Sequence, residues 1–124
     1  MKQSLGKAER LKSKILLGKL YKEGDSVKKF PLRMVFIQST HTSNYPAQVG
    51  VSVPKRNFKK AVHRNRIKRL LRETYRKQKH LVYDAIDIPY VFMISYIGKE
   101  ELPYDELAVK MEKLLNAFVD KINR

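Results

Sequence analysis

The stretch KRNFKKAVHRNRIKRLLRE, from Lys55 to Glu73, decides how the rest of the chain is interpreted. Its apolar residues recur every three or four positions, which is the spacing of one face of an α-helix. At about 100° per residue, one side of that helix carries Ile67, Leu70, Leu71 and Thr74, with Tyr75 at its edge. We therefore predict a helix that begins at Asn57, whose side chain can cap the first turn, and ends near His80.

The opposite side of this predicted helix is cationic. It carries Asn65, Arg69, Arg72 and Arg76, flanked by Arg66 and Lys68. The planar guanidinium group of arginine can engage two phosphate oxygens at once. Positive charge also extends over the start of the helix, from Lys55, Arg56, Lys59 and Lys60. There it opposes the helix macrodipole unless an anion offsets it, so the pattern indicates a surface that binds successive phosphates.

The charge of the whole chain is concentrated in this region. The 124 residues include 27 Lys and Arg against 12 Asp and Glu, a net charge of +15. Residues 55–80 hold twelve of the basic residues and a single acid, Glu73, whereas residues 81–124 carry a net charge of −3. Such segregation favours a polyanionic partner. We prefer nucleic acid to a membrane, because the apolar stripe is needed for the core; phosphate contacts alone do not distinguish RNA from DNA.

Outward from this helix, the flanking sequence predicts a small sheet. Residues 47–53 alternate between apolar and small or polar side chains, as a half-buried strand does. Residues 90–97 are apolar on both faces, which is typical of a central strand. The remaining predicted elements are strands at 32–38 and near 27–30, a loop at 41–46, a first helix over 11–22 that stops at Gly24, and a last helix from about 103 onward.

These elements predict a single α+β domain over residues 1–124, with about 1–8 loosely ordered. Its architecture would be a two-layer α/β sandwich of a mostly four-stranded sheet and three helices. The chain has no cysteine, which excludes disulfides and thiolate metal sites. No segment approaches the ~20 apolar residues that cross a bilayer. His41, His63 and His80 show no catalytic or metal-ligand spacing, so we expect no catalytic residue and no metal bound by the protein.

The triplet Arg64-Asn65-Arg66, followed by Ile-Lys-Arg-Leu-Leu-Arg, closely resembles the signature of the bacterial ribonuclease P protein subunit. The strand sequence VGVSV at 49–53 and the segment ERLK at 9–12 are also similar to that family, so the resemblance covers nearly the whole chain. With its basic flanks, the matching region implies an RNA-binding surface that comprises Lys55, Arg56, Lys59, Lys60, Arg64, Asn65, Arg66, Lys68, Arg69, Arg72 and Arg76.

The resemblance implies a concrete function. The family pairs with a catalytic RNA, one protein per RNA in the cytoplasm, and removes the 5′ leader from precursor tRNA as an endoribonuclease. The RNA carries out the catalysis with Mg²⁺, which it mainly holds itself, while the protein supplies binding and substrate discrimination. The family fold further implies a left-handed βαβ crossover at the central helix, against the usual right-handed rule.

The family also binds the single-stranded leader in a cleft between the first helix and the open sheet face, where aromatic rings stack on unpaired bases. By alignment, the cleft residues are Leu17, Tyr21, Phe36 and Ser52. Leu17 departs from the pattern, because many relatives carry an aromatic residue there. The sequence SYIGK at 95–99 also lacks the Arg-Lys pair that relatives often carry. For Tyr21 and Phe36, a place in the hydrophobic core is the alternative interpretation.

Two other functions stay open at this point. A ribosomal or general RNA-binding protein without a processing role could use the same basic helix. A stand-alone nuclease would cleave RNA with Mg²⁺ and without an RNA partner. Leader removal that requires both the protein and the catalytic RNA would distinguish a ribonuclease P subunit from both.

Overall fold

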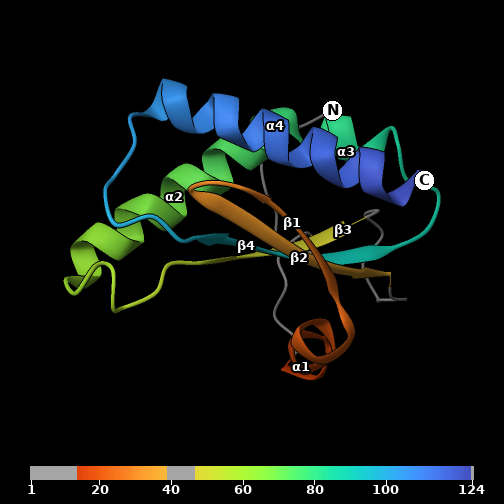
Figure 1. Ribbon diagram of the computed structural model, residues 1–124, viewed down its shortest axis with the longest axis horizontal. Coiled ribbons are helices and arrows are strands. Elements are labelled where there is room, and N and C mark those ends of the chain that lie inside the picture. The colour runs from red at the N-terminus through yellow and green to blue at the C-terminus, as the bar shows by residue number, and fades with distance from the viewer. Residues whose placement is uncertain (1–13, 39–46, 124) are drawn as a thin grey trace.

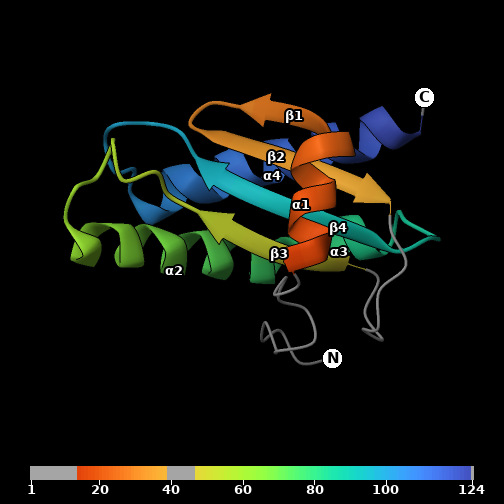
Figure 2. The same ribbon diagram turned by 90° about the horizontal axis from the view of Figure 1, so that it is seen from below.

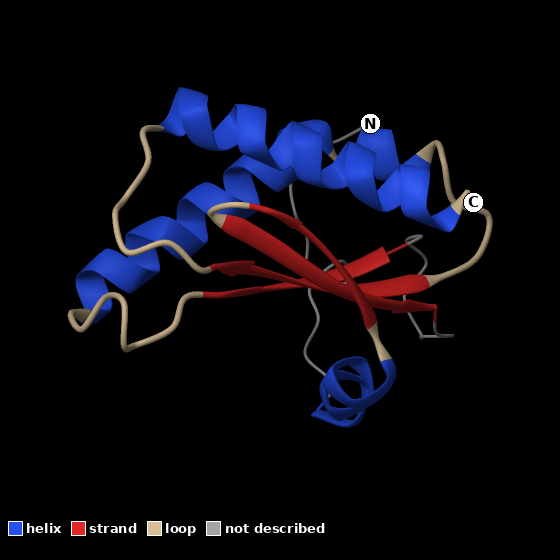
Figure 3. Cartoon of the chain, viewed as in Figure 1, coloured by secondary structure: helices blue, strands red, loops and turns tan. Residues whose placement is uncertain are grey.

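The computed structural model describes residues 14–38 and 47–123, which form four helices and four strands. The helices are α1 (Lys14–Glu23), α2 (Ala61–Gln78), α3 (His80–Tyr83) and α4 (Tyr104–Ile122). The strands are β1 (Asp25–Lys29), β2 (Leu32–Gln38), β3 (Ala47–Ser52) and β4 (Tyr90–Tyr96). One side of the sheet is covered by α2, α3 and α4, and α1 lies on the other side (Figures 1 and 3). The predicted α+β class is confirmed, with the single-turn α3 as an additional helix.

The strand order across the sheet is β1-β2-β4-β3. β4 is central: it pairs antiparallel with β2 and parallel with β3, which is why residues 90–97 are apolar on both faces. Because β3 and β4 are parallel neighbours, the chain between them has to cross back over the sheet, and α2 lies in that crossover. The left-handed sense of the crossover stays a prediction from the resemblance.

The two faces of the sheet pack against different helices. The main core lies under α2 and α4, where Met34 of β2 and Phe92 of β4 are fully buried. A smaller core lies under α1 and consists of Leu20, Val35, Val91 and Met93. Successive side chains of a strand point to opposite faces, so β2 and β4 each contribute alternate residues to the two cores.

The boundaries of the central helix differ from the sequence prediction. It begins at Ala61, with Lys60 as the N-cap residue, and ends at Gln78. Asn57 is therefore not its cap, and that prediction was wrong. The Asn57 side-chain nitrogen instead donates a hydrogen bond of 3.3 Å to the carbonyl oxygen of Ile97, just beyond β4. A partner forty positions away is not visible in local sequence patterns.

The prediction of the first helix is confirmed at its C-terminal end. Three further predictions fall outside the described residues: the start of this helix at residue 11, loose order of residues 1–8, and the loop at 41–46. The short strand near 27–30 is β1, which begins two residues earlier. It leads into β2 through Phe30 and Pro31, which are joined by a cis peptide bond.

Gly24 joins α1 to β1 where backbones approach closely. Its N–H donates a 2.8 Å hydrogen bond to the carbonyl oxygen of Leu20 and so closes α1. A Cβ atom at position 24 would lie 2.3 Å from that oxygen and 3.0 Å from the carbonyl oxygen of Phe36. Both are backbone atoms, which cannot move aside as a flexible side chain can. The placement of α1 against β2 therefore depends on a residue without a side chain.

We expect Gly24→Ala to lower the free energy of unfolding by about 1–3 kcal/mol, the usual cost of overpacking. Gly18→Ala is the matched control, because a Cβ atom at this helical position would meet no atom within 4 Å. The control should stabilise the protein by about 0.5–1 kcal/mol, because alanine favours a helix interior over glycine. Urea unfolding of both variants measures the difference. Equal stability of the two variants would contradict the close approach at Gly24.

Candidate nucleic-acid interface

The two sides of α2 differ in burial as the sequence predicted. Ile67, Leu71, Thr74 and Tyr75 are buried. On the other side, Asn65, Arg66 and Arg69 are exposed, and Lys68, Arg72 and Arg76 are half-buried. Burial of the apolar stripe therefore turns the guanidinium groups of α2 toward solvent. We call this side of the helix, together with residues 55–60, the basic surface.

The segment that leads into α2 adds four exposed cations to the basic surface. These are Lys55, Arg56, Lys59 and Lys60. The first turn of α2 contains no acidic residue, and Lys60 provides no side-chain cap. The positive end of the helix dipole is thus surrounded by positive side chains, an arrangement that an anion would stabilise.

Arg64 has a structural role that the sequence analysis missed. Its guanidinium nitrogen Nη1 donates hydrogen bonds of 2.8 Å to the carbonyl oxygens of both Phe58 and Lys59. These bonds hold the loop before α2 against the first turn of the helix. The half-buried Arg64 therefore positions the lysines of that loop, and its predicted contact with RNA stays a prediction.

Glu101 and Glu73 contact the basic surface. Glu101, from the loop after β4, lies 3.4 Å from Nη1 of Arg66. Glu73 contacts Arg76 and lies 3.8 Å from Nζ of Lys77. Surface ion pairs of this kind contribute only about 0–1 kcal/mol, so they leave the strong positive charge of α2 largely in place.

The opposite face of the sheet is only partly covered by α1 (Figure 2). Leu20 is fully buried and Leu17 half-buried against Val35, Val91 and Met93. Near the start of β2 and the ends of β3 and β4, the same face carries polar side chains. Arg33 of β2 and Ser52 of β3 both pair with Ser95 of β4. We call this polar end the open sheet face.

The open sheet face contains one of the predicted cleft residues, Ser52, and α1 brings Tyr21 beside it. Ser52 is half-buried there. As the sequence predicted, Gln48, Gly50 and Ser52 alternate with the core-facing residues of β3. Tyr21 of α1 is 56% exposed. Partial burial raises the pKa of its hydroxyl, while the nearby charge of Arg33 acts to lower it. Arg33 is therefore near enough for its charge to act on the exposed Tyr21.

Phe36 does not belong to this cleft, and its predicted role is corrected. Only 6% of its surface is exposed, and its ring packs edge-on against Phe118 of α4 with a centroid distance of 4.8 Å. Phe36 thus points into the main core, on the far side of the sheet from α1. The β2 residues that face α1 are Val35 and Ile37. The alternative interpretation of Phe36 as a core residue is correct.

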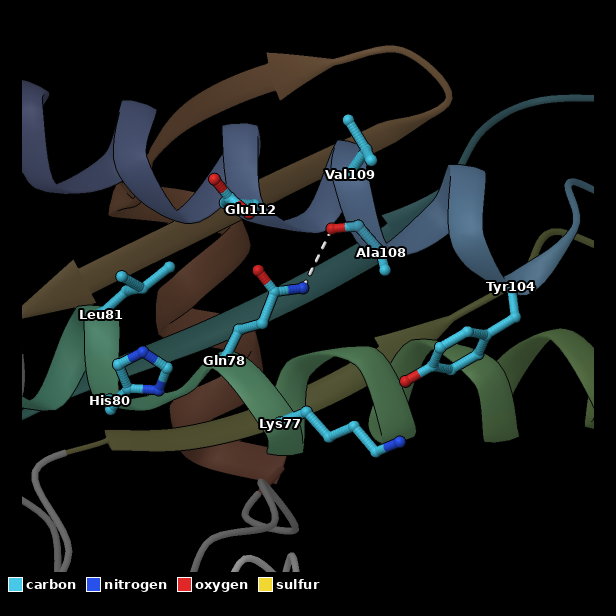
Figure 4. A pocket seen from close by; sticks show the side chains of 8 residues that line it. All are labelled: Lys77, Gln78, His80, Leu81, Tyr104, Ala108, Val109 and Glu112. Atoms are coloured by element: carbon cyan, nitrogen blue, oxygen red, sulfur yellow. Dashed lines mark hydrogen bonds between the residues drawn. The ribbon is translucent and has the colours of Figure 1, made fainter.

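Side-chain contacts across a groove between α2 and α4 join these two helices. Figure 4 shows Gln78 reaching across it, where the side-chain nitrogen donates a 2.9 Å hydrogen bond to the carbonyl oxygen of Ala108. Nearby, Nζ of Lys77 lies 5.2 Å from the centre of the Tyr104 ring, within cation–π range. These contacts fix the C-terminal end of α2 against α4 and keep the basic surface in one orientation.

Within residues 14–38 and 47–123, no three His, Asp or Glu side chains come together as a metal-binding group. None of the helices in this part of the chain is both long and apolar enough to span a lipid bilayer.

Comparisons with known proteins show the family of this chain. The family model described as Ribonuclease P matches residues 5–119. The ribonuclease P protein component of Porphyromonas gingivalis is 37% identical over 102 residues, covering 80% of this chain and 74% of the relative. That of Borreliella burgdorferi is 35% identical over 106 residues, 85% of each chain.

Solved structures share the fold. The RNase P protein of Staphylococcus aureus superimposes with a TM-score of 0.72 at 23% identity, covering 90% of this chain and 96% of that chain. The RNase P protein of Thermotoga maritima gives a TM-score of 0.68 at 25% identity, with 88% and 96% covered. The match of the family model over most of the chain, together with these relatives, shows that this chain belongs to the ribonuclease P protein family.

Proposed function

We propose that this ribonuclease P protein binds the catalytic RNA of the enzyme through the basic surface and holds the 5′ leader of precursor tRNA on the open sheet face. Membership in the family makes the chain an RNA-binding subunit of a tRNA-processing ribonucleoprotein. Cleavage of the leader is then an endonucleolytic step carried out by the RNA, one protein copy serving each RNA in the cytoplasm.

The observation that carries the proposal is the segregation of charge on α2. Residues 55–80 contain twelve cations and one acid, and the structure buries the apolar side of this helix while leaving Asn65, Arg66 and Arg69 exposed. Like charges at this density repel one another and lower stability. RNA phosphates would relieve that repulsion and release counterions from the RNA, which favours binding at low salt.

Mg²⁺ is expected to be held mainly by the RNA. The basic surface repels a divalent cation and attracts phosphate, and among the described residues no three His, Asp or Glu side chains come together as a metal-binding group. The protein contributes binding energy and orientation, and we derive no chemical step for its side chains.

The open sheet face suits a single strand of RNA. Tyr21 offers a partly exposed ring, Arg33 lies close to it, and Ser52 and Ser95 provide hydroxyl groups on the same face. An aromatic ring beside a cation is the combination that binds unpaired nucleotides with little dependence on their sequence. Leu17, half-buried against the small core, provides an apolar contact at a position where a ring would stack.

Reconstitution tests the proposed function. The protein is mixed with the catalytic RNA of the same organism at low Mg²⁺, and release of the 5′ leader from precursor tRNA is measured. We expect activity only when both components are present, because the cations of the basic surface replace part of the Mg²⁺ that the RNA needs for charge neutralisation. Cleavage by the protein alone would indicate a nuclease, and an RNA whose activity is unchanged by the protein would support a general RNA-binding role.

For the leader, we expect Tyr21→Ala to weaken binding of precursor tRNA to the assembled enzyme by about 5- to 150-fold, the loss of one stacked base. Binding of mature tRNA, which has no leader, should not change. Tyr21→Phe is the matched control, because it keeps the ring and should retain most of the affinity. Equivalent losses for precursor and mature tRNA would show that Tyr21 has only a structural role.

A further inference from the structure

A second groove lies at the turn between β1 and β2, away from the open sheet face. It encloses about 450 Å³ and is lined by residues of this turn, of the loop after β4 and of α4. Tyr96 and Leu102 form its apolar floor, and Phe30 stands at its rim with 61% of its surface exposed. The volume is within the range of sites that hold small organic groups.

The groove is held in shape by contacts between the turn and the loop. The N–H of Ile97 donates a 2.8 Å hydrogen bond to the carbonyl oxygen of Pro31, and the Tyr96 hydroxyl donates one to the carbonyl oxygen of Glu100. A Cβ atom at Gly98 would lie 2.8 Å from Cβ of Pro31, so turn and loop pack as closely as glycine permits. The exposed ring of Phe30 is therefore presented by a fixed support.

The groove and its rim carry several lysines. Lys29 precedes Phe30 in the chain and is exposed, and Lys99 and Lys110 line the groove. The acid on the lining is Glu100. Three lysines against one carboxylate give the groove a net positive charge, which complements a phosphate group and disfavours a cationic ligand. An exposed ring in such surroundings fits a nucleotide, whose base stacks while its phosphate meets ammonium groups.

The loop that lines the groove also contacts the basic surface. The loop that lines it is bonded to the start of α2 at two points, through Asn57 to the carbonyl oxygen of Ile97 and through Arg66 to Glu101. The turn between β1 and β2, this loop and the beginning of α2 lie at one end of the molecule (Figure 2). An RNA seated on the basic surface would thus have its next nucleotides near Phe30.

We propose that this groove binds one unpaired nucleotide of the catalytic RNA, with the base stacked on Phe30 and the phosphate contacted by Lys29 and Lys99. The inference rests on the proposed binding of that RNA to α2. The groove opens beside α4, whereas Tyr21 and Arg33 lie on the face of α1, so the catalytic RNA rather than the leader is its source. The site adds a stacking contact to an interface otherwise made of charges.

Binding of the catalytic RNA without tRNA, measured over a range of salt concentrations, tests the proposal. We expect Phe30→Ala to weaken binding by about 5- to 150-fold, as for one stacked base, without changing the salt dependence. Arg69→Ala should weaken binding and also flatten the log–log salt slope by roughly 0.7–0.9, because it removes a phosphate contact. An unchanged slope for Arg69→Ala would contradict the role of α2, independently of the result at Phe30.

A second variant gives a direct signal. The chain contains no tryptophan, so Phe30→Trp places a single tryptophan, which can be excited selectively, in the groove and keeps a ring that can stack. We expect it to retain affinity and to be quenched when the catalytic RNA is added. Unchanged binding by Phe30→Ala, or unchanged fluorescence of Phe30→Trp in the bound state, would overturn the proposal. If Phe30→Ala lost affinity only when precursor tRNA was present, the groove would bind the leader, and the proposal would likewise be overturned.

Discussion

Burial of one side of α2 determines where the charge of this protein lies. The helix crosses from β3 to β4, and Ile67, Leu71 and Tyr75 are removed from water beneath it. At roughly 1.5–3 kcal/mol for each large apolar side chain, this burial fixes the rotation of the helix about its own axis. The arginines on the other side are then directed outward, whatever the electrostatic cost. The position of every cation on the helix follows from the packing of its apolar stripe.

The rest of the fold keeps that packing in place. α4 lies beside α2 and inserts Phe118 among Phe36, Tyr90 and Phe92 with edge-on ring contacts. The region after residue 80 is slightly acidic, and one of its acids, Glu101, contacts Arg66 of the basic surface. The chain thus separates two tasks: its C-terminal part contributes β4 and α4 to the core, and its central part carries the positive charge to which we propose the RNA binds.

The sequence analysis succeeded where a pattern is local and repeated. The apolar stripe of α2 and the alternation of β3 are periodic, so their faces could be predicted. Phe36 was placed on the wrong face of the sheet. Alignment to a family identifies the strand, but a shift of one residue along that strand moves a side chain to the other face. Asn57 and Arg64 bond to backbone oxygens of loops, which no sequence pattern indicates. The Phe30 groove likewise depends on a tertiary contact between a turn and a distant loop.

The most direct test of the account is site-directed cross-linking of the protein to the catalytic RNA. The chain has no cysteine, so a photoreactive group can be attached at one introduced position at a time. Asn65→Cys places it on the basic surface, and Asn116→Cys places it at an exposed asparagine of α4. We predict efficient cross-links from position 65 and few from position 116. Equal yields from the two positions, or a higher yield from position 116, would contradict the claim that α2 forms the RNA interface.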